Sequence, residues 1–170
     1  MKNKTAAIYI LLIISGSHSA WSIRPSQIEL EVTADSVARI ALYYQDKPVA
    51  GNRFDFYLPV NGLSQKFEHT SAFFHIVGNV EKVSVAFEEQ NFYLHQVTGG
   101  SDKVTLAGGF IFRGVETDAS KLLQLPVIHS ISQATTHNGI KVHFTSEFLA
   151  GRYTKGHYAN TFTLLLTPVI

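Results

Sequence analysis

The sequence predicts an all-β protein that folds as a β-sandwich. Apolar and polar residues alternate with a period of two through most of the chain, which is the pattern of strands with one buried face. Turn signals separate roughly nine or ten such runs, a spacing typical of sandwiches. Only residues 118–123 favour a helix, and only for about one turn. No repeat or low-complexity tract interrupts the 170 residues, so we expect one folded domain.

In the first half of the chain, residues 28–32, 40–44 and 54–58 each place an apolar side chain at every second position. We therefore expect three strands there, the third running to Pro59. Asn61-Gly62 follows and predicts a two-residue hairpin turn, because both central positions of that turn need a positive φ.

The other internal strands are expected, in chain order, over residues 73–77, 83–87, 92–97, 104–106, 110–112 and 140–144. Residues 99–102 predict a turn, and Gly108-Gly109 separates two of the short strands. A second Asn-Gly pair, at 138–139, repeats the hairpin signal just before the last of them.

The C-terminal run from Tyr158 to Thr167 reads as one amphipathic strand, with Tyr158, Phe162, Leu164 and Leu166 on one face. It is either the ordinary last strand of a self-contained sandwich or an edge that a further strand completes. The strand at 28–32 leaves a similar choice, because it belongs to the chain's own sheet or is donated to a neighbouring chain by β-strand addition.

The first 22 residues predict a secretory signal peptide. Lys2 and Lys4 form a positively charged start, and the apolar run 6–14 is too short to span a membrane. Small residues give two cleavage points, after Ser19 or after Ser22. We therefore expect an exported protein without a membrane anchor.

Composition excludes further classes. Charged residues make up 16% of the chain, with 14 Lys and Arg against 13 Asp and Glu, and this near-neutral balance argues against nucleic acid as a partner. The chain has no cysteine, so zinc sites built on cysteine are excluded. Its stability must come from packing or from something that another chain supplies.

Four segments, taken in order and spacing, carry a family resemblance: 27–35, 104–109, 139–144 and 156–166. In them the sequence resembles the pilin subunits of alpha-clade chaperone–usher fimbriae, the group that includes colonisation factor antigen I. The likeness covers nearly all of the chain after the signal peptide, and the absence of cysteine agrees with it. The chain departs from the family at Ser36, where members often have proline.

The resemblance implies an incomplete immunoglobulin-like sandwich that lacks its final strand. A periplasmic chaperone fills the resulting groove first, and the N-terminal extension of the next subunit fills it later, at the outer-membrane usher. Residues 23–36 are then the donor-strand extension and 37–170 the pilin domain. The implied donor residues are Ile28, Leu30, Val32 and Ala34, and the implied acceptor residues are Tyr158, Phe162, Leu164 and Leu166.

No motif indicates an enzyme, because no Gly-x-Ser-x-Gly occurs and the histidines form no recognisable catalytic set. His137 and His143 could share a metal, but two ligands fill only half of a tetrahedral zinc site. We therefore expect no catalytic residue, metal or cofactor. His75 and His143 alternate with apolar neighbours and are expected to face outward.

Two aromatic pairs, Phe73-Phe74 and Phe92-Tyr93, either pack in the core or line a sugar-binding face. Two classes of function therefore stay open. One is the structural subunit of a surface fimbria that supports adhesion to a host receptor. The other is a self-contained secreted β-sandwich binding module, lectin-like or a fimbrial tip adhesin. Roughly 150 mature residues hold one sandwich rather than two, which argues against a two-domain adhesin.

Overall fold

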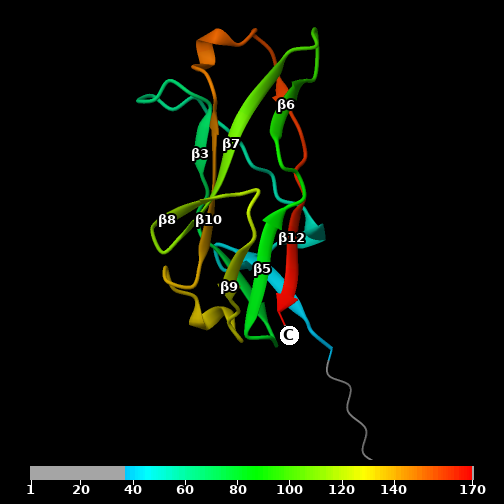
Figure 1. Cartoon of the computed structure of the whole chain (residues 1–170), viewed down its shortest axis with the longest axis vertical. Helices are drawn as coiled ribbons and strands as arrows, with labels where there is room; N and C mark the ends of the chain where they lie inside the picture. Colours follow the sequence, from blue (N-terminus) through cyan, green and yellow to red (C-terminus); the bar gives the residue numbers. More distant parts are fainter. Residues whose placement is uncertain (1–36, 170) are drawn as a thin grey trace, which may run out of the picture. The chain divides into compact units, whose positions relative to one another are not determined.

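The structure, a computed structural model, describes residues 37–169 (Figure 1). The predicted signal peptide and donor segment, with Ile28, Leu30, Val32 and Ala34, lie outside the described residues. The elements in chain order are β1 (Ile40–Tyr44), β2 (Lys47–Pro48), the 3-10 turn η1 (Ala50–Asn52), β3 (Glu68–Thr70), β4 (Phe74–Gly78), β5 (Lys82–Phe87), β6 (Phe92–Gln96), β7 (Lys103–Phe112), β8 (Val115–Asp118), β9 (Leu123–Pro126), η2 (Ile131–Gln133), β10 (Ile140–Ser146), η3 (Ala150–Arg152), β11 (Tyr158–Ala159) and β12 (Leu164–Val169).

Two antiparallel sheets share one hydrophobic core. The larger sheet has nine strands in the order β11-β6-β7-β10-β4-β1-β2, with β3 added to β10 and β8 added to β7. The smaller sheet has the order β12-β5-β9. Buried side chains from both sheets form a single cluster, so the prediction of an all-β sandwich is confirmed.

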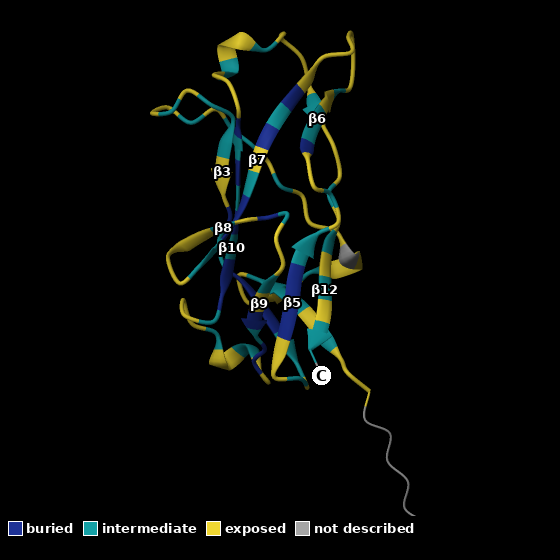
Figure 2. Ribbon diagram, in the orientation of Figure 1, coloured by how far each residue is buried: buried dark blue, intermediate teal, exposed yellow. Residues whose placement is uncertain are grey.

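Strand β10 shows how the sequence alternation becomes a packed layer. Ile140, Val142 and Phe144 are buried, and the residues between them are half-buried on the outer face. Figure 2 shows that buried residues concentrate on β5, β7 and β10. The core therefore lies under the centre of the larger sheet and against β5.

Strand β7 is one strand of 10 residues, so the prediction of two short strands around Gly108-Gly109 is wrong. A Cβ at Gly108 would lie 2.7 Å from the ring of Phe144 and 2.9 Å from the ring of Phe92. The glycine is thus a place where two rings lie against a strand backbone rather than a turn.

Neither Asn-Gly pair forms the predicted hairpin turn. The side chains of Asn61 and Asn138 instead accept backbone N–H groups inside longer turns. The two-residue turns with positive φ are Gln45-Asp46 (φ 47° and 64°), between β1 and β2, and Arg113-Gly114 (φ 52° and 79°), between β7 and β8. Sequence signals missed both because Gln and Arg are uncommon at such positions.

Residues 118–123 contain the end of β8 and a turn, so the predicted helical turn is wrong. Asp118 Oδ1 accepts hydrogen bonds from the backbone N–H of Ser120 at 2.9 Å and from its hydroxyl at 2.8 Å. A side chain that caps its own turn competes with helix formation. The bonds from the Ser120 backbone and hydroxyl also hold the pKa of Asp118 below its ordinary value, because they favour the ionised form.

The close packing at Gly108 gives a stability prediction. Gly108→Ala should lower the free energy of unfolding by about 1–3 kcal/mol, because Phe144 and Phe92 must move to admit a methyl group. Gly62→Ala is the matched control, since no heavy atom lies within 4 Å of its Cβ position. Its effect should stay within about 0.5 kcal/mol. Equilibrium urea unfolding measures both, and equal effects would contradict the packing argument.

Candidate functional site

The C-terminal run, predicted as one strand, forms two strands in two sheets. β11 pairs with β6 at the edge of the nine-stranded sheet, and β12 pairs with β5 at the edge of the three-stranded sheet (Figure 1). Tyr158 therefore lies in a different sheet from Leu164 and Leu166. The prediction that these residues share one continuous strand is wrong.

The strands that pair with β12 and β11 are β5 and β6, which follow one another in the chain and also belong to different sheets. Side chains bridge the link where the ladder is interrupted. Asn160 Nδ2 donates to the Tyr93 carbonyl at 2.7 Å, and the Glu89 carboxylate accepts from Thr163 N at 3.0 Å. The C-terminal chain thus follows an edge of both sheets in turn, which an alternating pattern alone does not reveal.

The backbone of β12 has one bonded side and one open side. Glu88 N donates to the Thr163 carbonyl at 2.9 Å, and the register pairs Leu164 with Phe87. Because inward and outward bonding alternates along an antiparallel strand, Leu164, Leu166 and Pro168 direct their backbone groups away from β5. Within the described part of the chain, no strand lies on that side. Proline, which has no N–H, is tolerated at such an edge position.

The side chains of this segment reach the core but are incompletely covered. Leu164 and Leu166 are half-buried against the core, whereas Leu165, between them, is 45% exposed. The ring of Phe162 packs at centroid distances of 5.1 Å from Phe92 and 5.5 Å from Phe144. Figure 2 shows the contrast between β5, which is largely buried, and β12 beside it.

A second segment, residues 54–58, has the same character. Phe56 and Leu58 are half-buried against the core, and Tyr57 between them is 79% exposed. No strand is present there, so the strand predicted over 54–58 is wrong. The described residues supply no backbone hydrogen bond to this segment, and a strand without a partner cannot form a ladder. The ring of Phe56 lies 5.6 Å from that of Phe144.

These two segments lie outside the stretch of sequence that supplies the fully buried core. All of the buried hydrophobic side chains among residues 37–169 lie between Phe74 and Phe144. The half-buried apolar residues outside that range that pack on the core include Ile40, Leu42, Tyr44, Phe56, Leu58, Tyr158, Phe162, Leu164 and Leu166. Because Phe56 and Phe162 contact the same buried ring, the segment 54–58 and the β11–β12 edge border one incompletely covered region of the core. We call it the open flank.

Three histidines singled out from the sequence, His75, His137 and His143, lie outside the segments that border the open flank. His75 is buried, with Nε2 3.0 Å from the Thr135 carbonyl, so its predicted outward position is covered by the turn that precedes β10. His143 places Nδ1 2.7 Å from Thr70 Oγ1 and Nε2 3.9 Å from Glu68 Oε1, and this group ties β3 to β10. His137 is exposed and lies in a different segment.

Between residues 37 and 169, no three side chains of the metal-binding types are grouped so that they could hold an ion. No helix in this range is long and apolar enough to cross a membrane.

The aromatic pairs divide between core and surface. Phe74 and Phe92 are buried in the core, whereas Phe73 and Tyr93 are half-buried on the outer side. Lys141 Nζ lies 4.5 Å from the ring centre of Phe73, and Lys103 Nζ lies 4.4 Å from that of Tyr93.

Comparison with known proteins adds little. No family model matches the sequence, and no curated protein is detectably similar to it. Among solved structures, the chain is similar to one from a study of a chaperone–tip adhesin complex in the biogenesis of CFA/I fimbriae. The TM-score is 0.49 and the identity 13%, over 76% of this chain and 42% of the other, so this chain spans less than half of that protein. A likeness of this size does not indicate a function.

The inward and outward residues of β12 differ in a testable way. Leu166→Ala should lower the free energy of unfolding by about 1–2 kcal/mol, less than at a fully buried leucine because the site is partly covered. Leu165→Ala, one residue away and 45% exposed, should change it by about 0.5 kcal/mol or less. Urea unfolding of both variants measures the difference. A larger effect at Leu165 would mean that β12 presents its other face to the core.

Proposed function

We propose that the chain is a structural subunit of a surface fimbria that the chaperone–usher pathway assembles by donor-strand exchange. The open flank carries this proposal. It combines an unpaired backbone edge at Leu164 and Leu166 with apolar side chains that are only half covered. Both features favour the addition of one more strand from another chain. The family resemblance of the sequence supports the same reading.

The proposed occupant is the 23–36 segment of a neighbouring subunit. Its apolar residues Ile28, Leu30, Val32 and Ala34 stand at alternate positions, so one face of an added strand would be apolar. Burying one large aliphatic side chain contributes about 1.5–3 kcal/mol, and three would contribute roughly 5–9 kcal/mol before ordering costs. Backbone bonds to Leu164 and Leu166 would fix the register, whereas Pro168 offers only its carbonyl.

The proposed partners follow from the same edge. An uncovered apolar edge promotes aggregation, so a periplasmic chaperone would occupy it before assembly and an outer-membrane usher would receive the complex. The subunit would then pass through the periplasm to the cell surface. There the fimbria would support adhesion to a host receptor.

The donor segment can be tested by one substitution. Leu30→Asp should stop fibre growth, because a charge would have to be buried without a partner, while the subunit's own acceptor edge stays intact. The Leu30→Asp subunit should still bind the chaperone, and it should cap fibres or remain in the periplasm. Glu31→Ala, on the opposite face, should assemble normally. Electron microscopy of surface fibres and periplasmic fractionation give the readout. Fibres of normal length from Leu30→Asp would favour a self-contained binding module.

The acceptor side has its own test. Expressed in the periplasm without a chaperone, the chain should aggregate or be degraded, because the open flank stays uncovered. Co-expression with the chaperone should restore a soluble complex. Size-exclusion chromatography and immunoblotting of the periplasmic fraction distinguish these states. A stable monomer that lacks residues 23–36 and unfolds in two states would contradict the proposal.

A further inference from the structure

We propose that a cavity on the outer face of the nine-stranded sheet binds an anionic monosaccharide unit of a glycan, one that bears a carboxylate or a sulfate. The cavity has a volume of about 280 Å³. Its lining includes Phe73, Ile111, Arg113, Thr136, His137 and Lys141. These residues come from β7, β10, the turn after β7 and the two loops that lead into β4 and β10.

Two cations in this lining are held in place without a counter-ion. Lys141 Nζ lies 4.5 Å from the ring centre of Phe73. Arg113 Nε donates to the His137 carbonyl at 3.0 Å, and its two Nη groups have no partner among the described residues. Neither cation forms an ion pair within residues 37–169. The nearby carboxylate of Glu116 lies against Gly109 and is not part of the lining.

The backbone at Arg113 determines where its side chain leaves the sheet. Arg113 has a φ of 52° at the first position of the β7–β8 turn, followed by Gly114 at 79°. This turn favours Asn, Asp or Gly at that position, and arginine occupies it here, as Gln45 does in the β1–β2 turn. The turn projects a fixed guanidinium over the cavity, where it can form two parallel bonds to an acid group.

The size and walls of the cavity favour a sugar unit over an acidic protein segment. The volume lies just below the usual range for ligand sites, so the cavity suits a single ring with its acid group. Phe73 and Ile111 offer an apolar wall for the C–H face of a ring, and the Thr136 hydroxyl offers a hydrogen bond to a sugar hydroxyl. An acidic side chain would use the cations and leave this wall uncovered.

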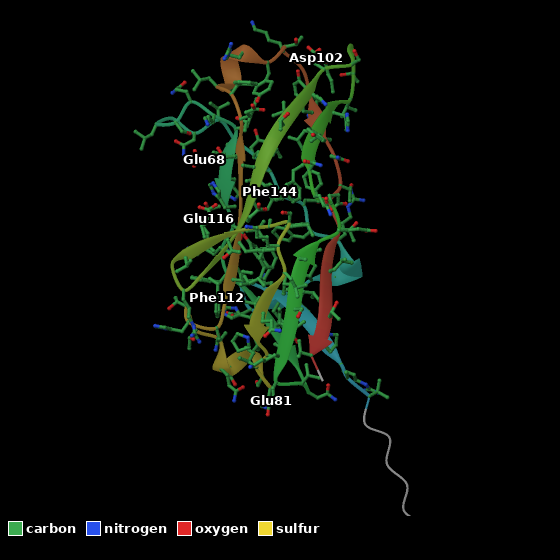
Figure 3. All side chains as sticks on the ribbon, viewed as in Figure 1. Glu68, Glu81, Asp102, Phe112, Glu116 and Phe144 are labelled. Carbon is green, nitrogen blue, oxygen red and sulfur yellow. The ribbon has the colours of Figure 1, made fainter. Side chains whose placement is uncertain are left out.

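A second cavity provides a natural comparison. It has a volume of about 490 Å³, and its two cations again lie against aromatic rings. Arg152 lies 4.9 Å from the ring centre of Phe148, and Lys103 Nζ lies 4.4 Å from that of Tyr93. The carboxylate of Asp102 also lines it, so this cavity, unlike the first, contains an anion of its own. Figure 3 shows Asp102 far from Phe112, which contacts Arg113 beside the first cavity.

The first cavity is independent of the open flank. Ile111 and Lys141 are cross-strand neighbours on the outer face, whereas Phe110 and Val142, the next pair, are buried in the core. A strand added at β12 joins the other sheet and leaves the cavity open. The cavity would therefore be accessible in a fimbrial subunit and in a secreted binding module alike.

The test is a titration of the full chain, in the form in which it is purified, with single sugars. NMR chemical shifts of the protein monitor the binding. The probes are glucuronic acid and N-acetylglucosamine 6-sulfate, with uncharged glucose and N-acetylglucosamine as references. At least one acid should bind saturably, and at least about tenfold more tightly than its uncharged parent. The two acids distinguish a carboxylate site from a sulfate site. Absence of saturable binding by either, or equal binding of the uncharged sugars, would overturn the proposal.

Two variants locate the site. Arg113→Asn introduces a residue that this turn prefers, so the variant should fold at least as stably. Its affinity for the acid should fall about tenfold or more. Lys141→Gln should weaken binding similarly. Arg152→Gln and Lys103→Gln, from the second cavity, should leave the affinity unchanged. Equal losses in these controls, or occupation of the site by a glutamate-rich peptide but by no saccharide, would overturn the assignment.

Discussion

The packing around one buried ring, Phe144, holds together the parts of the domain that matter for its proposed role. Its neighbours, with their centroid distances, are Phe92 at 5.2 Å, Phe162 at 5.5 Å, Phe56 at 5.6 Å and Phe87 at 5.7 Å. These rings come from β6, from the link before β12, from the segment 54–58 and from β5 in the smaller sheet. The two sheets and both borders of the open flank therefore depend on the same aromatic cluster.

Because of this dependence, the stability of the domain and its capacity to accept another strand rest on the same contacts. The borders of the open flank are anchored at Phe144 but contribute less hydrophobic stabilisation than a closed core would, since the burial term scales with the area removed from water. No disulfide compensates, because the chain has no cysteine. A strand from another chain would cover the apolar side chains and satisfy the backbone of Leu164 and Leu166 together. The completed sandwich would then cover the part of the core that the open flank leaves exposed.

Local alternation in the sequence was enough to locate β1, β4, β5, β6 and β10, because each has one face on the core. The predictions were wrong where contacts with another segment, rather than the local sequence pattern, determine the structure. Segment 54–58 has the pattern of a strand but no partner among the described residues, and Gly108 sits in a strand because Phe144 lies over it. For the site, the inward residues of β12 were identifiable from their spacing. The change of sheet after Tyr158 was not, since both strands of the pair make it together.

Because side chains alternate between the two faces of a strand, the residues that form the core and those that line the proposed sugar site are different ones. In β7 and β10 the core-facing residues support the sandwich, while Ile111 and Lys141, one position on, line the cation-rich cavity. Strand exchange at β12 would therefore repeat an uncovered cavity in every subunit of a fibre. Single acidic sugars bind weakly to small, open sites, but repeated sites on one polymer raise the effective affinity by orders of magnitude when the glycan can reach several of them. A shallow cavity of this kind is thus better suited to a polymer than to an isolated domain.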